Sequence, residues 1–98
     1  MGDAFLVTEL PKEENMGEKR IAIIGIFVEE RDSVEAVNAV LHDNGQHIVG
    51  RMGVPYKDRG ISVISLIVDA TSNEINNICG KLGKIKGVSV KSVCAKNV

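Results

Sequence analysis

The chain has 98 residues, of which 44% are hydrophobic, so it is long enough for one compact domain and too short for two. Its charges nearly cancel, at a net charge of -1, which excludes a strongly basic nucleic-acid-binding protein and a protein held to anionic membranes by charge. With no tryptophan, one tyrosine and two phenylalanines, its core has to be built from aliphatic side chains.

The first 18 residues are predicted to form a flexible leader outside the folded domain, which we expect to span residues 19–98. Pro11 and the charged run at residues 12–15 interrupt any regular apolar pattern. The apolar residues 5–7 leave open an alternative in which they extend the edge of a sheet. No segment reaches the roughly 18 apolar residues of a membrane span, and the start of the chain does not resemble a secretory signal. We therefore expect a cytoplasmic protein.

Four segments have the patterns of β-strands. Residues 20–28 and 61–68 are apolar at both alternating sets of positions, which predicts strands that are covered on both faces. Residues 47–54 and 88–95 alternate more clearly between apolar and polar, as strands at the edge of a sheet do. Residues 55–60 contain turn-forming Pro, Asp and Gly, so the second and third strands are predicted to form a β-hairpin.

The first arm of this hairpin is expected to be half-solvated. Strict alternation places Ile48 and Met52 on one face of the strand and Arg51 on the other. Gly50 and Gly53 stand three residues apart in the same arm, and they indicate either a β-bulge or the close approach of a neighbouring chain.

A first helix is predicted over residues 33–44, where apolar residues recur at helical spacing. Asp32 and Glu35 have the spacing of a capping box, in which a capping side chain and an acid three positions later satisfy free backbone N–H groups. Gly45 is placed to close this helix in a left-handed conformation.

A second helix is predicted to follow the third strand. Thr71 and Glu74 form another candidate capping box, and a second apolar stripe ends near Gly83.

The predicted order of elements is strand, helix, strand, strand, helix, strand. This order favours an α+β, ferredoxin-like fold, with a four-stranded antiparallel sheet, the two doubly apolar strands at its centre and two helices on one face. The other face would leave apolar side chains of the central strands in water, and such patches usually mark interaction surfaces. We therefore expect a homo-oligomer, a dimer or a tetramer, that covers this face.

Three segments resemble a known family. VEERDSVEAVNAVLHDNG, IVGRMGVPYKDRGISVISLIVDAT and CGKLGKIKGVSVKSV are similar to parts of the iron-only hydrogenase system regulators. The fold of these small proteins resembles ACT domains and the C-terminal domain of the nickel-responsive regulator NikR. The resemblance implies an ACT-like fold, dimers or tetramers, and a role in regulation, including transcription regulation, connected with iron-only hydrogenase. The chain lacks the ribbon-helix-helix domain of NikR, so direct DNA binding is not expected.

The resemblance also implies a ligand site. In ACT-like proteins, small effectors bind near the loop that leaves the first strand and near a subunit interface. This implies a site at Glu29, Glu30, Arg31 and Asp32, with Arg51 as a further contact for an anion. The alternative is a solvated loop that only begins a helix.

No metal, cofactor or catalytic site is predicted. The soft metal ligands are His42, His47, Cys79 and Cys94, and their spacing matches no metal-binding motif. Both cysteines are expected on core-facing positions, where a free thiol behaves as a small hydrophobe. No Ser or Cys stands beside a His in a nucleophile motif, and Tyr56 and Arg59 are interpreted as turn residues.

The leading hypothesis is a regulatory module that senses a small-molecule effector or contacts a hydrogenase-related protein. The first alternative is a small dimeric ferredoxin-like enzyme with a site built across subunits, and the second is a transcriptional regulator that binds DNA. An enzyme should have a deep cleft with a convergent acid or base, whereas a sensor should have a shallow pocket near residues 29–32.

Overall fold

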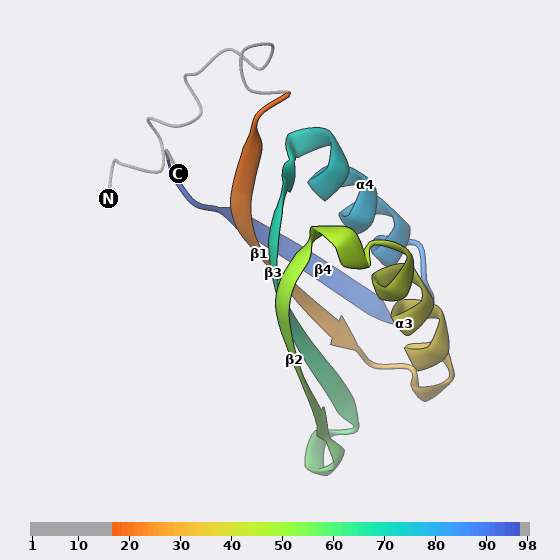
Figure 1. Ribbon diagram of the computed structural model, residues 1–98. Helices are drawn as coiled ribbons and strands as arrows, with labels where there is room; N and C mark the ends of the chain where they lie inside the picture. Colours follow the sequence, from red (N-terminus) through yellow and green to blue (C-terminus); the bar gives the residue numbers. More distant parts are fainter. Residues whose placement is uncertain (1–16, 97–98) are drawn as a thin grey trace.

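Figure 1 shows the computed structural model of the chain, in which residues 17–96 are described. The main elements are β1 (Lys19–Val28), α3 (Val34–Asp43), β2 (Ile48–Tyr56), β3 (Ile61–Thr71), α4 (Ser72–Gly83) and β4 (Val88–Cys94). Short 3-10 helices lie between some of them: η1 (Arg31–Ser33), η2 (Gly45–His47) and η3 (Lys57–Arg59). Of the predicted leader and domain, residues 1–16 and 97–98 lie outside the described residues.

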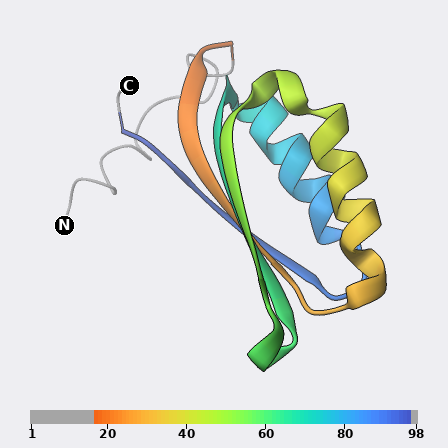
Figure 2. The same cartoon turned by 60° about the horizontal axis from the view of Figure 1, so that its bottom comes forward.

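The four strands form one antiparallel sheet in the order β2-β3-β1-β4. The doubly apolar segments are therefore its central strands, and the alternating segments are its edges, as predicted. Both helices cover one face of the sheet (Figures 1 and 2), and within residues 17–96 no helix covers the other face, which we call the open face. This arrangement confirms the predicted α+β, ferredoxin-like and ACT-like fold.

The core lies between the sheet and the two helices. Even-numbered residues of β1 and β3 face the helices, and Ile24 and Leu66, which are paired across the two strands, are completely buried. The core consists of Ala22, Ile24, Ile26, Val28, Val37, Leu41, Ile64, Leu66, Val68, Ala70, Ile75, Ile78 and Leu82. All of these are aliphatic, as the composition predicts.

A β-bulge near the start of β2 changes which side chains face the helices. Ile48 and Gly50 pair with consecutive residues of β3, so Val49 is an extra residue in the register. The prediction that Ile48 and Met52 share a face is therefore wrong: Ile48 packs against the core, whereas Met52 lies on the open face. The bulge itself is one of the two readings that the glycines of this arm indicated.

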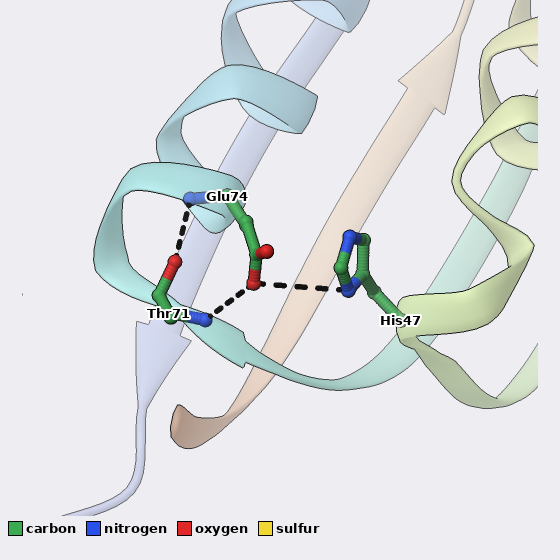
Figure 3. Close-up of polar contacts among 3 residues, drawn as sticks. All are labelled: His47, Thr71 and Glu74. Atoms are coloured by element: carbon green, nitrogen blue, oxygen red, sulfur yellow. Dashed lines mark hydrogen bonds and ion pairs between the residues drawn. The ribbon is translucent and has the colours of Figure 1, made fainter. Parts of the chain in front are cut away.

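The predicted capping box at the start of α4 is confirmed (Figure 3). The Glu74 backbone N donates to Thr71 Oγ1 at 3.2 Å, and the Thr71 backbone N donates to Glu74 Oε1 at 2.9 Å. Two backbone N–H groups at the helix start are thereby satisfied. The helix ends at Gly83, as the apolar stripe predicts.

The capping box predicted for α3 is wrong. Asp32 lies inside η1, and Ser33 is the N-cap of α3 without any side-chain hydrogen bond to the helix. A capping residue normally has an extended backbone, whereas Ser33 has φ -87° and ψ -6° because the 3-10 turn leads directly into the helix. Ser33 Oγ donates instead to the backbone O of Lys86 at 2.7 Å.

The predicted left-handed closure of α3 by Gly45 is also wrong. Gly45 begins η2, and among the described glycines only Gly60 and Gly87 have positive φ. Asn44 closes the helix instead, because its backbone N and its side-chain Nδ2 both donate to the backbone O of Val40, at 3.2 and 2.8 Å. An amide side chain thus satisfies the end of the helix without a left-handed residue.

Candidate functional site

The open face is mostly apolar. Ile23 of β1 and Ile67 of β3 are paired on it, and they are 52% and 44% exposed. Successive rows across the strands hold Val93, Ile23, Ile67 and Gly50; then Lys91, Gly25, Ser65 and Met52; then Ser89, Phe27, Val63 and Val54. Two largely apolar rows thus flank a row of mainly small or polar residues. An exposed apolar surface with contributions from every strand is typical of an interaction surface.

Two loops at one end of the domain are joined by hydrogen bonds. The Glu29 backbone N donates to the Gly87 backbone O at 2.8 Å, next to the bond between Ser33 Oγ and Lys86. Gly87 has φ 73°, and a Cβ at this position would lie 2.6 Å from the Cβ of Glu30. The loop after β1 is therefore held closely against the loop between α4 and β4.

Two open hollows flank the turn between β2 and β3, which projects beyond the helical layer (Figures 1 and 2). The first has a volume of about 520 Å³ and is lined by Glu29, Tyr56, Arg59, Gly60 and Ile61. The second has a volume of about 440 Å³, shares Tyr56, Gly60 and Ile61 with the first, and is also lined by Val28, Arg31, Val34, Pro55 and Lys57. These volumes are in the range of small-molecule sites, about 300–1,000 Å³.

The structure brings only some of the predicted ligand-site residues to these hollows. Glu29 lines the first hollow and Arg31 the second. Glu30 is partly buried against Gly87, and Asp32 is exposed in η1. Arg51 lines neither hollow, and its Nη2 donates to Asn38 Oδ1 of α3 at 3.3 Å.

Three residues at the hollows were not predicted as site residues. Tyr56, Lys57 and Arg59 lie at or within the hairpin turn, where the sequence pattern indicates only a turn. The available signal was the pair of cations beside an aromatic residue. This pattern points to a site only when the fold brings Glu29 to one side of the turn and Arg31 to the other.

A second polar cluster links the start of α4 to η2 (Figure 3). Glu74 Oε1 lies 3.8 Å from His47 Nδ1, and the same carboxylate accepts the hydrogen bond from the Thr71 backbone. That backbone hydrogen bond is the main reason why the pKa of Glu74 is lowered, and the charge of His47 adds a smaller effect. Glu74 therefore serves as a helix cap with a nearby histidine.

The two cysteines are free thiols in different environments. Cys79 is partly buried against the core, and burial raises the pKa of its thiol. Cys94 lies opposite the core residue Ala22, on the side of the sheet that faces the helices, as predicted. It is nevertheless exposed at the last residue of β4, so the expectation of a buried thiol is wrong for Cys94. Within residues 17–96, no three His, Cys, Asp or Glu side chains gather as they would around a metal ion, and no helix of this part is long and apolar enough to cross a membrane.

Comparison with known proteins identifies the family. Residues 20–92 match the family described as "TM1266-like: Iron-only hydrogenase system regulator, putative". The chain belongs to this family. The structure of the uncharacterized protein TM1266 from Thermotoga maritima is 35% identical to the chain, with a TM-score of 0.78, and the match covers 81% of this chain and 100% of that one.

More distant structures share the fold alone. The C-terminal domain of the MgtC protein from Mycobacterium tuberculosis is 11% identical, with a TM-score of 0.63, and the match covers 81% of this chain and 90% of that one. A formyltetrahydrofolate deformylase from Pseudomonas putida KT2440 is 10% identical, with a TM-score of 0.57, over 80% of this chain and 29% of that one. No curated protein matches the chain. Membership of the regulator family therefore comes from the family match and from TM1266.

Proposed function

We propose that the chain is a regulatory module of an iron-only hydrogenase system that acts as a homo-oligomer. In this proposal the open face is the assembly surface, and the hollows beside the β2–β3 turn receive a small-molecule effector. The observation that carries the proposal is the apolar open face, on which Phe27, Ile23 and Ile67 are 40 to 52% exposed in the single chain.

A second copy of the chain is the partner that fits this surface best. The two apolar rows contain no charged residue, so they can meet the same rows of a second copy without burying an unpaired ion. The charged residues of the open face lie outside these rows. Lys91, in the row between them, is on the edge strand β4 and can keep its ammonium group in water, and Asp69, opposite Ile21, lies in the row beyond Ile23 and Ile67. A twofold axis would place the same rows of both copies against each other, as in other isologous dimers.

The other parts of the proposal follow from the family and the composition. The family carries the name of a regulator, and we assign no catalytic residue. We also assign no direct contact with DNA, because a chain with a net charge of -1 offers few cations for phosphates. Two free cysteines accord with a reducing, cytoplasmic location.

Light scattering on the full-length protein tests the assembly. We expect the wild-type protein to have the mass of a dimer or a larger oligomer, and Ile67→Lys to reduce that mass to one chain, because it places an ammonium group inside the interface. Asn77→Lys is the matched control, since it adds the same charge to an exposed position of α4. A monomeric wild-type protein, or an Ile67→Lys variant with unchanged mass, would contradict the proposal.

A further inference from the structure

We propose that the two hollows beside the β2–β3 turn form one site for a small organic anion, a carboxylate or a phosphate carried on a compact apolar body. This inference rests on the proposed sensing function and adds the chemical class of the effector. The two hollows share Tyr56, Gly60 and Ile61, so the Tyr56 side chain is within reach of a ligand in either of them.

The charge of the lining favours an anion. Arg31 and Lys57 line one hollow and Arg59 lines the other, while Glu29 is the one carboxylate among the lining residues. No hydrogen bond or ion pair joins the side chain of Arg31, Lys57 or Arg59 to another residue in the described part of the chain. Three cations without such partners, two at one hollow and one at the other, attract an anion to this end of the domain, and each can donate to its oxygens.

The apolar part of the lining favours a ligand with an apolar body. Val28 and Val34 come from the end of β1 and the start of α3, and Pro55 and Ile61 come from the two arms of the hairpin. With the ring of Tyr56, they form a surface on which an aromatic or aliphatic group can pack. The volumes of about 520 and 440 Å³ suit a small molecule.

The hairpin turn is built to hold its cations in place. Gly60 has φ 65°, and its backbone N donates to the Lys57 backbone O at 3.1 Å, which closes η3. The left-handed conformation is accessible to glycine at little cost and rare for other residues. Lys57 and Arg59 therefore start from a fixed backbone, which lowers the entropic cost of binding a ligand.

Amide chemical shifts of the full-length, 15N-labelled protein test the ligand class with four probes that share a phenyl ring. Phenylacetate and phenyl phosphate are the two anions, phenylacetamide is neutral and phenethylammonium is cationic. We expect both anions, or one of them, to shift amides of residues 29–34 and 56–62, and the other two probes to bind at least several-fold more weakly. The two anions also separate a carboxylate ligand from a phosphate ligand.

Variants assign the effect to the proposed side chains. Replacement of Arg31, Lys57 or Arg59 by Gln should weaken binding of the anion by about two- to fivefold each, as expected for a partly exposed ion pair. Arg51→Gln is the matched control, because it removes a cation that lines neither hollow. Equal losses with Arg51→Gln would show that only the net charge matters and would overturn the site.

The remaining outcomes separate this inference from the proposed function. Equal or tighter binding of the neutral or cationic probe at residues 29–34 and 56–62 would overturn the anion class and leave a sensing site in place. If no probe shifts these amides at about 10 mM, well above the Kd of about 1 mM common for weak small ligands, both the anion class and the sensing role at the hollows are wrong. Light scattering on the same samples would still decide the assembly separately.

Discussion

Ile23 and Ile24 are adjacent in β1 and point to opposite faces of the sheet, so they provide a paired test of the two faces. Ile24 is completely buried under the helices, and Ile23 is 52% exposed on the open face. Replacement of either by Ala removes three carbon atoms from the same strand. Any loss of intrinsic strand propensity is therefore similar in both variants and cancels in the comparison.

The magnitudes follow from burial. Three methylene equivalents at about 0.8 kcal/mol each give a transfer term of roughly 2.4 kcal/mol for a fully buried side chain. The cavity left in the core adds to this, so Ile24→Ala should lower the free energy of unfolding by about 3–4 kcal/mol. Ile23 keeps half of its surface in water in the single chain, so Ile23→Ala should cost only about 1 kcal/mol in a monomer.

Urea unfolding at a low and a high protein concentration measures both effects. Ile24→Ala should be strongly destabilised at both concentrations. Ile23→Ala should lie only about 1 kcal/mol below the wild-type protein at the low concentration and fall further behind it at the high one, where assembly stabilises the wild-type protein more than the variant. Equal losses for both variants at the low concentration would refute the assignment of the faces, and a loss for Ile23→Ala that does not depend on concentration would refute assembly through the open face.

Three further predictions concern other parts of the domain. The pKa of Glu74 is lowered in the folded state, so its carboxylate stabilises the domain above the unfolded pKa near 4.5, and this stability is lost as the pH falls through the lower folded pKa. Thermal melts should therefore show a loss of stability in acid for the wild-type protein and a flatter dependence on pH for Glu74→Gln. Gly87→Ala should destabilise the domain by more than about 1 kcal/mol, because Gly87 has φ 73° and a Cβ at this position would meet Glu30. The control Gly80→Ala adds a Cβ in open space on α4 and should be neutral or stabilising, and stabilisation by Gly87→Ala would contradict the close loop contact. A thiol reagent should modify the exposed Cys94 quickly and Cys79 slowly, because burial raises the pKa of the Cys79 thiol. Cys94→Ser should remove the fast phase of the reaction, and a fast phase that persists in this variant would contradict the assigned exposures.

The fold could be predicted because apolar alternation directly reports burial. The segments with apolar residues on both alternating sets of positions are β1 and β3, and the order of elements then allows few topologies. Side-chain caps were less predictable. Asp32 with Glu35 and Thr71 with Glu74 have the same pattern, but only the second forms a capping box, because the loop at Lys86 binds Ser33 and η1 changes the backbone before α3.

The candidate site was predicted only in part, for a physical reason. The sequence identifies which residues have charges, but a hollow is formed by the fold, which brings residues 29–34 next to the hairpin turn. Tyr56, Lys57 and Arg59 therefore looked like turn residues, and Arg51 was grouped with a loop that it does not join. The same limit explains why Ile24 and Leu66, on doubly apolar strands, could not be assigned to the covered or the open face before the register was known.

The bulge in β2 lets the strand hold one extra residue without moving the side chains that follow it. Deletion of Val49 would leave every other pair in place, with Gly50 opposite Ile67, Arg51 opposite Leu66 and Met52 opposite Ser65. A strand that kept this residue but paired it with Ile67 would instead turn Arg51 to the open face, and the bond to Asn38 would be lost. Related chains that are one residue shorter at this point should therefore keep the same open face, whereas chains that keep the residue without the bulge should have a different one.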